Sequence, residues 1–272
     1  MMSKTIEDVR RFWDANPLLV GEIDEPVGTE AWFLEFDRIK TQDVFLGHVE
    51  KWTPARPAGK RVLDVGCGPG YWGRLFGRMG VEYYGIDISP NAVELARESQ
   101  RIFGFKGDIR VGNAEDTGFE DGYFDFVVSE GVIHHTPNTE KCIDEIHRVL
   151  KDGGGARIGL YYKSAILRSR VLFRLAQLLM RAVGVGLKGR GRTAMGLAES
   201  PEEFVRMYDG RENPIGKAYG KPELLSMFSR FSDIRLSRYY FPWRALPVKP
   251  PLWVRRILGR RLGLMVLVEL RK

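Results

Sequence analysis

Three glycines lie close together in the run VLDVGCGPG, at Gly66, Gly68 and Gly70. Glycine allows the positive φ of a tight turn and lets a ligand lie against bare backbone. Asp64 precedes the first glycine by two residues, and a carboxylate there repels a pyrophosphate and attracts an ammonium. The spacing is GxGxG, whereas dinucleotide-binding turns have GxGxxG. The run therefore predicts a site for a nucleoside that carries an amino-acid end.

A second acidic group, Asp87, follows Gly70 by 17 residues, in the run GIDIS. At the end of a strand, its carboxylate can accept both hydroxyl hydrogens of a ribose. Farther along the chain, Asn113, Ala114 and Glu115 supply an amide side chain and backbone groups that could hold an adenine edge. These residues support a nucleoside ligand without choosing its class.

Groups suited to proton transfer occur in the run SEGVIHH, residues 129–135. His134 or His135 could act as a general base, because the unperturbed pKa of histidine is about 6.5. Glu130 could bind an acceptor amine or the cofactor. The alternative is that the two rings order the loop and shape the pocket, since many group transfers need only approach and alignment.

The elements that must position these groups alternate between strand and helix from residue 61 onward, which is typical of a parallel sheet with crossover helices. We predict strands at 61–65, 82–87, 107–111, 123–129, 156–161, 233–241 and 264–270. Helices are expected at 71–79, 90–103, 139–150 and 222–228. The fold class is a Rossmann-like, doubly wound, mostly parallel α/β sheet of seven strands with helices on both faces.

The domain organisation follows from what lies outside this alternation. Residues 1–60 show helical patterns at 5–16 and 29–52 and are expected to form an N-terminal helical cap on the α/β domain of 61–272. Insertions are expected at about 163–220, after the fifth strand, and at about 242–261, between the sixth and seventh strands.

Composition excludes several classes of protein. The 272 residues are 44% hydrophobic and 28% charged, which is ordinary for a globular protein and rules out a wholly disordered chain. Two cysteines, Cys67 and Cys142, indicate neither a disulfide framework nor a cysteine metal site. No signal sequence and no uninterrupted apolar run of about 18 residues is visible, so we expect a cytoplasmic protein.

Five runs occur in order over residues 61–154: VLDVGCGPG, GIDIS, GNAEDTGFEDGYFDFVVS, GVIHH and HRVLKDGG. Together they resemble the class I S-adenosylmethionine-dependent methyltransferases, particularly the small-molecule enzymes grouped with the ubiquinone and menaquinone methylases. Asn113 and Glu130 depart from the family's commoner residues, which are aspartate at the first position and asparagine or an apolar residue at the second. The resemblance implies S-adenosylmethionine as cofactor, S-adenosylhomocysteine as product and no metal.

The resemblance also implies roles for residues. The three glycines would line the methionine end, Asp87 the ribose, and residues 113–115 the adenine. The residues expected to contact the cofactor are Asp64, Gly66, Cys67, Gly68, Gly70, Asp87, Ile88, Asn113, Ala114, Glu115, Ser129 and Glu130. By analogy, the segments before the first strand and after the fifth cover the acceptor, with candidate wall residues Trp13, Trp32, Phe33, Tyr161, Tyr162, Tyr208 and Tyr219.

We expect a small, hydrophobic acceptor methylated on oxygen or carbon, in a monomer or homodimer. Nucleic acid is not the expected acceptor, because no (Asp/Asn)-Pro-Pro-aromatic turn follows the fourth strand and the basic segments lack aromatic interleaving over much of 181–192. A nucleic-acid methyltransferase, a non-catalytic cofactor-binding protein and a nicotinamide oxidoreductase remain alternatives.

The net charge of +7 is concentrated in two segments. Residues 163–192 hold eight Lys or Arg and residues 242–261 hold six, with no acid in either. Mixed with leucine and other apolar residues, such segments can lie on an anionic membrane or guard a lipophilic pocket. The alternative is helices that pack on their own domain with the arginines in solvent.

Overall fold

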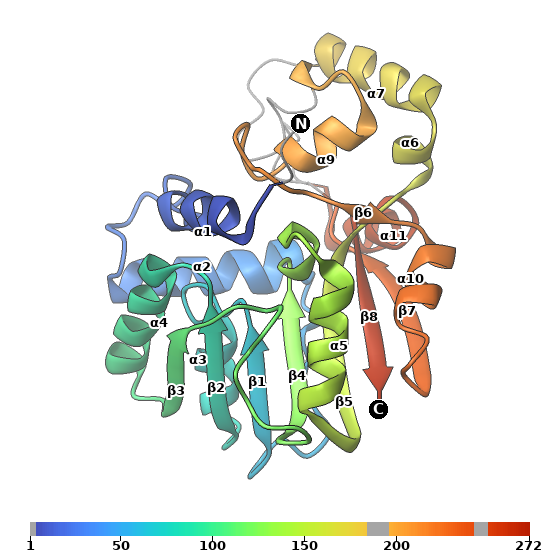
Figure 1. The fold of residues 1–272 in the computed structure, drawn as a ribbon. Coiled ribbons are helices and arrows are strands. Elements are labelled where there is room, and N and C mark those ends of the chain that lie inside the picture. The colour runs from blue at the N-terminus through green and yellow to red at the C-terminus, as the bar shows by residue number, and fades with distance from the viewer. Residues whose placement is uncertain (1–3, 184–195, 242–249) are drawn as a thin grey trace.

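A single sheet runs through the computed structural model, which describes residues 4–183, 196–241 and 250–272 (Figure 1). The strand order is β3-β2-β1-β4-β5-β8-β7, and β6 pairs with β5. Only β8 runs antiparallel to its neighbours among the described strands. The strands are β1 (Arg61–Val65), β2 (Glu82–Asp87), β3 (Gly107–Val111), β4 (Phe124–Glu130), β5 (Leu150–Tyr162), β6 (Ala218–Tyr219), β7 (Asp233–Tyr239) and β8 (Met265–Arg271).

The predicted mostly parallel α/β fold is confirmed, with two differences in the strands. The described sheet has eight strands where seven were expected, because the two residues of β6 pair with the end of β5 at Tyr161 and Tyr162. Strand β5 begins at Leu150, earlier than predicted, since the glycine-rich residues after it continue the pairing with β4 past a bulge.

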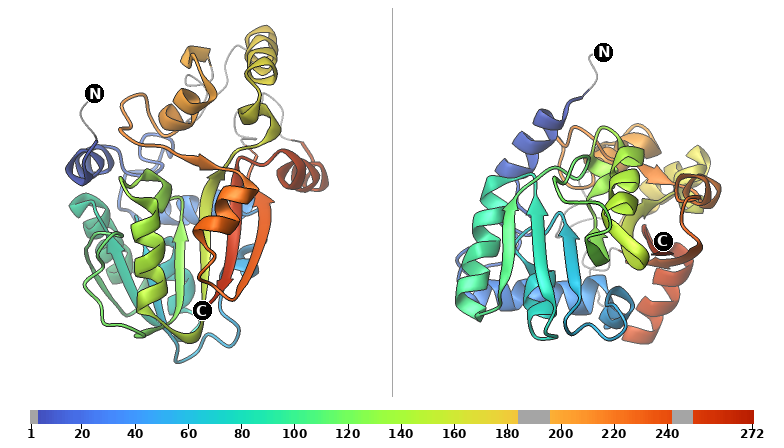
Figure 2. Two further views of the ribbon diagram at one scale, coloured as in Figure 1. Left: turned by 45° about the vertical axis from the view of Figure 1, so that its right-hand side comes forward. Right: turned by 60° about the horizontal axis from the view of Figure 1, so that its bottom comes forward.

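Helices cover both faces of the sheet, as Figure 2 shows from two further directions. On one face, α2 (Glu30–Arg38), α3 (Tyr71–Gly77) and α4 (Pro90–Phe103) enclose a core rich in aromatic residues. On the other face, α5 (Thr139–Val149) and α10 (Lys221–Met227) enclose an aliphatic core. Alternation along β1 sends Val62 to the first core and Leu63 to the second.

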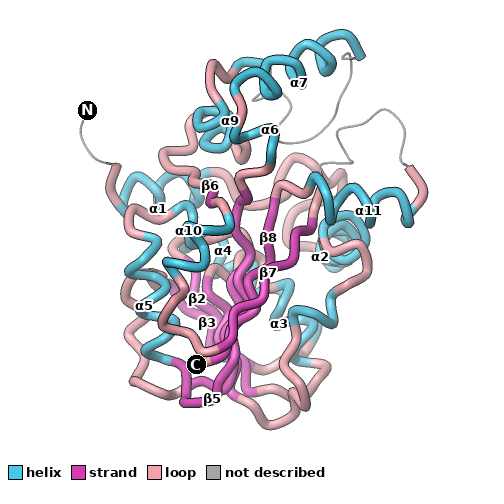
Figure 3. The backbone as a smooth tube through the Cα atoms, turned by 90° about the vertical axis from the view of Figure 1, so that its right-hand side faces the viewer, coloured by secondary structure: helices cyan, strands magenta, loops and turns pink. Residues whose placement is uncertain are grey.

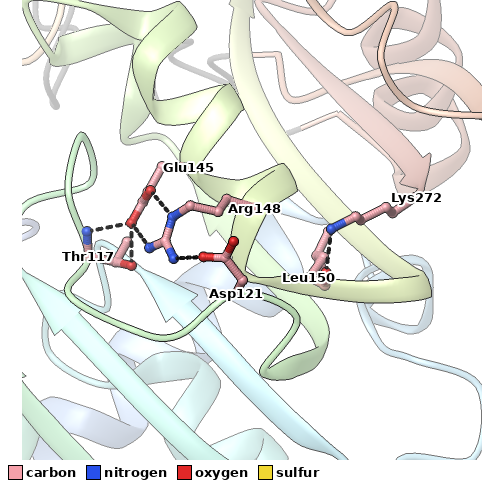
Figure 4. A network of polar contacts seen from close by, with 6 residues as sticks. All are labelled: Thr117, Asp121, Glu145, Arg148, Leu150 and Lys272. Carbon is pink, nitrogen blue, oxygen red and sulfur yellow. Dashed lines mark hydrogen bonds and ion pairs between the residues drawn. The ribbon is translucent and has the colours of Figure 1, made fainter.

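Polar contacts attach the loop after β3 to helix α5 (Figure 4). The Glu145 carboxylate accepts hydrogen bonds from the backbone N–H and the hydroxyl of Thr117, at 2.8 and 2.7 Å. Arg148 pairs with both Glu145 and Asp121. The loop that carries residues 113–115 is therefore held against the end of the sheet.

The first 60 residues do not form one continuous cap. Helix α1 (Ile6–Ala15) begins with a capping box between Thr5 and Asp8 and lies across the start of α4, where Asp14 accepts the Ser89 hydroxyl at 2.8 Å. The pattern predicted at 29–52 is divided into α2, the π-helical η1 (Ile39–Val44) and the 3₁₀ helix η2 (Val49–Trp52). Helix α1 lies over the carboxyl ends of the strands (Figure 1).

The insertion after β5 contains α6 (Ala165–Arg168), α7 (Arg170–Val183) and α9 (Pro201–Met207), beyond the carboxyl ends of the strands (Figure 3). These helices share a small core that includes Phe173 and Phe204. Helix α11 (Leu252–Leu262) joins β7 to β8. No helix within the described ranges is both long and apolar enough to cross a bilayer. Five of the basic residues noted above, Lys188, Arg190, Arg192, Arg244 and Lys249, lie outside the described residues.

Candidate active site

The glycine-rich turn leaves the carboxyl end of β1, as predicted. Gly66, Gly68 and Gly70 have φ values of 79°, 48° and 81°. The N–H groups of Gly66 and Cys67 donate to the carbonyl of Ile86 on β2, at 2.7 and 2.9 Å. Gly70 takes the left-handed N-cap of α3. The turn therefore needs glycine for its backbone and exposes its other polar groups at the edge of the sheet.

Asp87 at the tip of β2 fixes the same turn. One carboxylate oxygen accepts the N–H of Gly68 and the other accepts the N–H of Ser89, both at 2.9 Å. Burial raises the pKa of Asp87, while the hydrogen bonds from Ser89 and Gly68 act in the opposite direction. The carboxylate thus joins two strand ends at the position where a ribose was predicted.

A cavity of about 230 Å³ opens beside this turn, between the ends of the strands and helix α1. Eleven of the residues that the sequence singled out line it: Trp13, Gly66, Gly68, Asp87, Ile88, Asn113, Ala114, Glu130, His135, Tyr161 and Tyr208. The cavity therefore brings together groups predicted for the cofactor and groups predicted for the acceptor.

Five residues predicted to contact the cofactor do not line the cavity. Cys67 has a buried thiol, and burial raises its pKa. Gly70 faces Ala96 of α4, and the Glu115 carboxylate accepts the N–H of Asn138 at 2.8 Å. Ser129 is fully buried within β4. The fifth is Asp64.

Asp64 is fully buried below the turn. Its Oδ2 accepts the hydroxyl of Tyr83 at 2.8 Å, and its Oδ1 has no hydrogen-bond partner among the described residues. Burial raises the pKa of Asp64 to about 8, although the Tyr83 hydrogen bond lowers it. A carboxyl group in this state is mostly protonated at neutral pH, and a cation at Oδ1 would favour its charged form.

Four residues predicted to form the acceptor wall lie elsewhere. Trp32 and Phe33 are completely buried, because the apolar side of α2 packs onto the sheet and the Phe33 ring lies 4.9 Å from the guanidinium of Arg74. Tyr162 follows Tyr161 in β5 and so points to the opposite face, in the aliphatic core. Tyr219 donates its hydroxyl to Thr139 at 2.8 Å.

The two histidines have different environments. His134 is fully buried, is not part of the cavity wall, and has neither ring nitrogen hydrogen-bonded within the described chain. Burial lowers the pKa of His134 well below its usual value, so the ring stays neutral. Its ring packs between those of His135 and Tyr161, with centroid distances of 4.1 and 4.2 Å. This environment fits the alternative that the His134 ring orders the loop, and it does not favour His134 as a base.

His135 lines the cavity and meets Asp209, a residue that the sequence reasoning missed. Its Nδ1 lies 2.7 Å from the carbonyl oxygen of Ile215, and its Nε2 lies 3.2 Å from Asp209 Oδ2. The Tyr161 hydroxyl donates to the same carboxylate. Because a carbonyl can only accept, Nδ1 carries a proton, and the Nε2 side of the ring faces the carboxylate.

Glu130 forms a buried ion pair with Lys40, also missed by sequence. The side chains are 7% and 8% exposed, and the Tyr239 hydroxyl donates to Glu130 at 3.2 Å. Both charged groups line the cavity. Since Lys40 neutralises Glu130, the carboxylate is not free to bind a second cation at full strength.

The rest of the cavity wall is largely apolar. Helix α1, the segment after it and η1 contribute the aliphatic side chains of Ile6, Val9, Leu18, Leu19, Ile39 and Val44. Met265 of β8 also lines the wall. No described group of three or more His, Cys, Asp or Glu side chains is placed to hold a metal ion. The arrangement suits an apolar ligand beside a polar nucleoside site.

Comparisons with known proteins agree with this geometry. The methyltransferase domain family matches residues 63–158. A ubiquinone biosynthesis O-methyltransferase of Xanthomonas oryzae pv. oryzae is 35% identical over 192 residues, which cover 69% of this chain and 69% of that protein. The enzyme with the same name in Xanthomonas axonopodis pv. citri is 36% identical over 121 residues, covering 44% of this chain and 48% of the relative.

Among solved structures, a SAM-dependent methyltransferase from Aquifex aeolicus superimposes with a TM-score of 0.53 at 16% identity, covering 88% of this chain and 95% of that one. This likeness bears on the fold alone. Taken with the relative that is matched over two thirds of its length, the domain match and the ordered motifs, it shows that the chain belongs to the class I S-adenosylmethionine-dependent methyltransferases.

Proposed function

We propose that this enzyme transfers the methyl group of S-adenosylmethionine to an oxygen or carbon atom of a small, hydrophobic acceptor in the cavity beneath α1. One observation carries the proposal: the glycine turn and Asp87 line the same cavity as Trp13, Tyr161 and Tyr208. The relatives are ubiquinone biosynthesis O-methyltransferases, which supports methylation of an oxygen atom in small-molecule biosynthesis.

The residues present fit the cofactor. A Cβ at Gly68 would meet no atom within 4 Å, so the turn leaves room for a ligand against its backbone. The unpartnered Oδ1 of Asp64 suits the ammonium of a methionine, directly or through water. Asp87 would hold the ribose, and Asn113 with Ala114 the adenine. The bound sulfonium would supply an electrophilic methyl group.

The protein's own part is alignment, exclusion of water and disposal of a proton. Aliphatic residues of α1 and η1 would keep the acceptor against the cofactor and apart from solvent. For a hydroxyl acceptor, the pair formed by His135 and Asp209 would take the proton that the hydroxyl gives up. His135 Nε2 and Asp209 Oδ2 lie 3.2 Å apart and would share that proton.

A screen for formation of S-adenosylhomocysteine tests the proposal, with phenols, quinols, lipids and sugars as acceptors. We expect turnover with phenols or quinols that carry an apolar substituent. His135→Gln should lower turnover by about 100-fold or more, whereas His48→Gln, at a half-buried position that does not line the cavity, should leave it unchanged. Cofactor binding without methylation of any acceptor would favour the non-catalytic reading, and methylation of RNA or DNA alone would contradict a small acceptor.

A further inference from the structure

Helix α7 presents an apolar face to solvent. Five side chains make up this leucine face: Val171, Leu172, Leu175, Leu178 and Leu179. They recur at spacings of three and four residues, which places them on one side of a helix. Val171 and Leu179 are 69% and 68% exposed. A contiguous face of this kind is rare on soluble proteins unless it binds something.

The opposite side of α7 fixes the helix to the protein. Phe173 is 1% exposed and packs on Phe204 of α9, with ring centroids 5.8 Å apart. Gln177 is buried and donates to the carbonyl of Ala198 at 2.8 Å. The alternative from sequence, a helix packed on its own domain with its arginines in solvent, describes this side of α7, but the leucines remain exposed.

Positive charge accompanies the leucine face. Arg170 and Arg174 are exposed on the adjoining side of α7. The sequence contains no aspartate or glutamate between residues 163 and 192. An apolar face bordered by arginines and free of acids is complementary to a surface that is apolar inside and anionic at its edge.

A second helix repeats the combination. On α11, Trp253 is 66% exposed and Ile257 is 47% exposed, and Arg260 and Arg261 are exposed beside them. Arg255 is instead buried and pairs with Asp43 at 3.2 Å. Figure 3 shows α7 at the top of the molecule, beyond the carboxyl ends of the parallel strands, and α11 below it, beside β7 and β8.

We propose that the leucine face of α7 and the exposed side of α11 together dock on an anionic lipid membrane. The leucines would enter the boundary between headgroups and acyl chains, Trp253 would lie at headgroup level, and the arginines would contact lipid phosphates. A second copy of the chain is a poorer occupant, because two arginine-bordered faces without acids repel each other.

Co-sedimentation with vesicles tests the proposal without cofactor or acceptor, so its failure is separate from failure of the methyltransferase assignment. The probes are vesicles of equal parts phosphatidylglycerol and phosphatidylcholine, and vesicles of phosphatidylcholine alone. We expect binding to the first, weakened at high salt. The double variant Leu175→Glu/Leu179→Glu should lower binding at least tenfold. Leu34→Glu, an equally exposed leucine on α2, is the matched control and should bind as wild type does.

Two further readouts separate the occupants. The pair Arg170→Gln/Arg174→Gln should lose most of the salt-sensitive binding, and Trp253→Phe should remove a blue shift in emission on anionic vesicles. Equal sedimentation of wild type and the double glutamate variant would overturn the proposal. So would a dimer in solution that those glutamates dissociate into monomers, because the face would then bind a second copy.

Discussion

Substitution of Gly66 by alanine should damage the centre of the cofactor site. A Cβ at this position would lie 2.2 Å from Cγ2 and 2.6 Å from Cγ1 of Val132, and the backbone has φ +79°. The left-handed conformation costs about 1–2 kcal/mol for a residue with a Cβ, and relief of an overpacked contact costs about 1–3 kcal/mol more. We expect the free energy of unfolding to fall by the sum, about 2–5 kcal/mol.

Urea unfolding of five proteins separates the two contributions: wild type, Gly66→Ala, Gly68→Ala, Val132→Ala and Gly66→Ala/Val132→Ala. Gly68→Ala is the matched control, because it adds a Cβ at φ +48° with no atom within 4 Å and should lose the backbone cost alone. Gly66→Ala/Val132→Ala removes the clash and should be less destabilised than additivity predicts. If Gly66→Ala unfolds at the same urea concentration as wild type, or if Val132→Ala gives no rescue, the close approach of the turn to Val132 is wrong.

Three other predictions concern buried groups. Lys40→Met should lower the free energy of unfolding by about 3–5 kcal/mol, because Glu130 is left buried without its partner. Lys40→Met/Glu130→Gln should lower it by less in the same urea assay. An equal or larger loss in the double variant would refute the pairing. The pKa of Asp64 is raised to about 8 in the folded state and is about 3.9 in the unfolded chain. The free energy of unfolding should therefore be highest below pH 4 and fall as the pH rises to 8, by at most about 1.4 kcal/mol per pH unit. Asp64→Asn should lack that decline, and identical pH dependence in the two proteins would contradict the raised pKa. Trp32→Ala should cost about 3–5 kcal/mol without changing the affinity for S-adenosylhomocysteine in calorimetry, whereas Trp13→Ala should slow methylation of the acceptor with little loss of stability; the reverse pattern would return Trp32 to the pocket wall.

The sheet could be predicted because its signals are local. Short β-branched runs, the Ser89 cap with Pro90 and the left-handed Gly104 each indicate where an element begins or ends within a few residues of sequence. The start of β5 could not be predicted. The sequence around Leu150 is typical of a helix end, and Leu150 joins the strand only because it pairs with Phe124 on β4.

The residues proposed for the cofactor could be predicted because their signals are also local in sequence. The residues proposed for the acceptor could not. Gly66, Gly68 and Asp87 belong to compact runs. Asp209 reaches His135 only after the insertion folds back across the end of the sheet, and Lys40 reaches its partner from a π-helical turn. Nothing in the spacing of either residue marks such a contact.

Aromatic residues show a related limit. Trp13 and Trp32 both stand in amphipathic helices of the first 60 residues, and composition does not tell them apart. The structure separates them because α1 lies over the strand ends while α2 packs on the face of the sheet. Which helix covers the site depends on tertiary packing that hydrophobic periodicity alone does not specify.

Calorimetric titration with S-adenosylhomocysteine tests most directly the claim that this cavity is the methyl-donor site. Wild type should bind with a micromolar dissociation constant, Asp87→Ala should show no binding, and Asp209→Asn, which changes the partner of His135, should bind as wild type does. NAD should give no heat. Undiminished binding by Asp87→Ala, or binding of NAD in place of S-adenosylhomocysteine, would contradict the account.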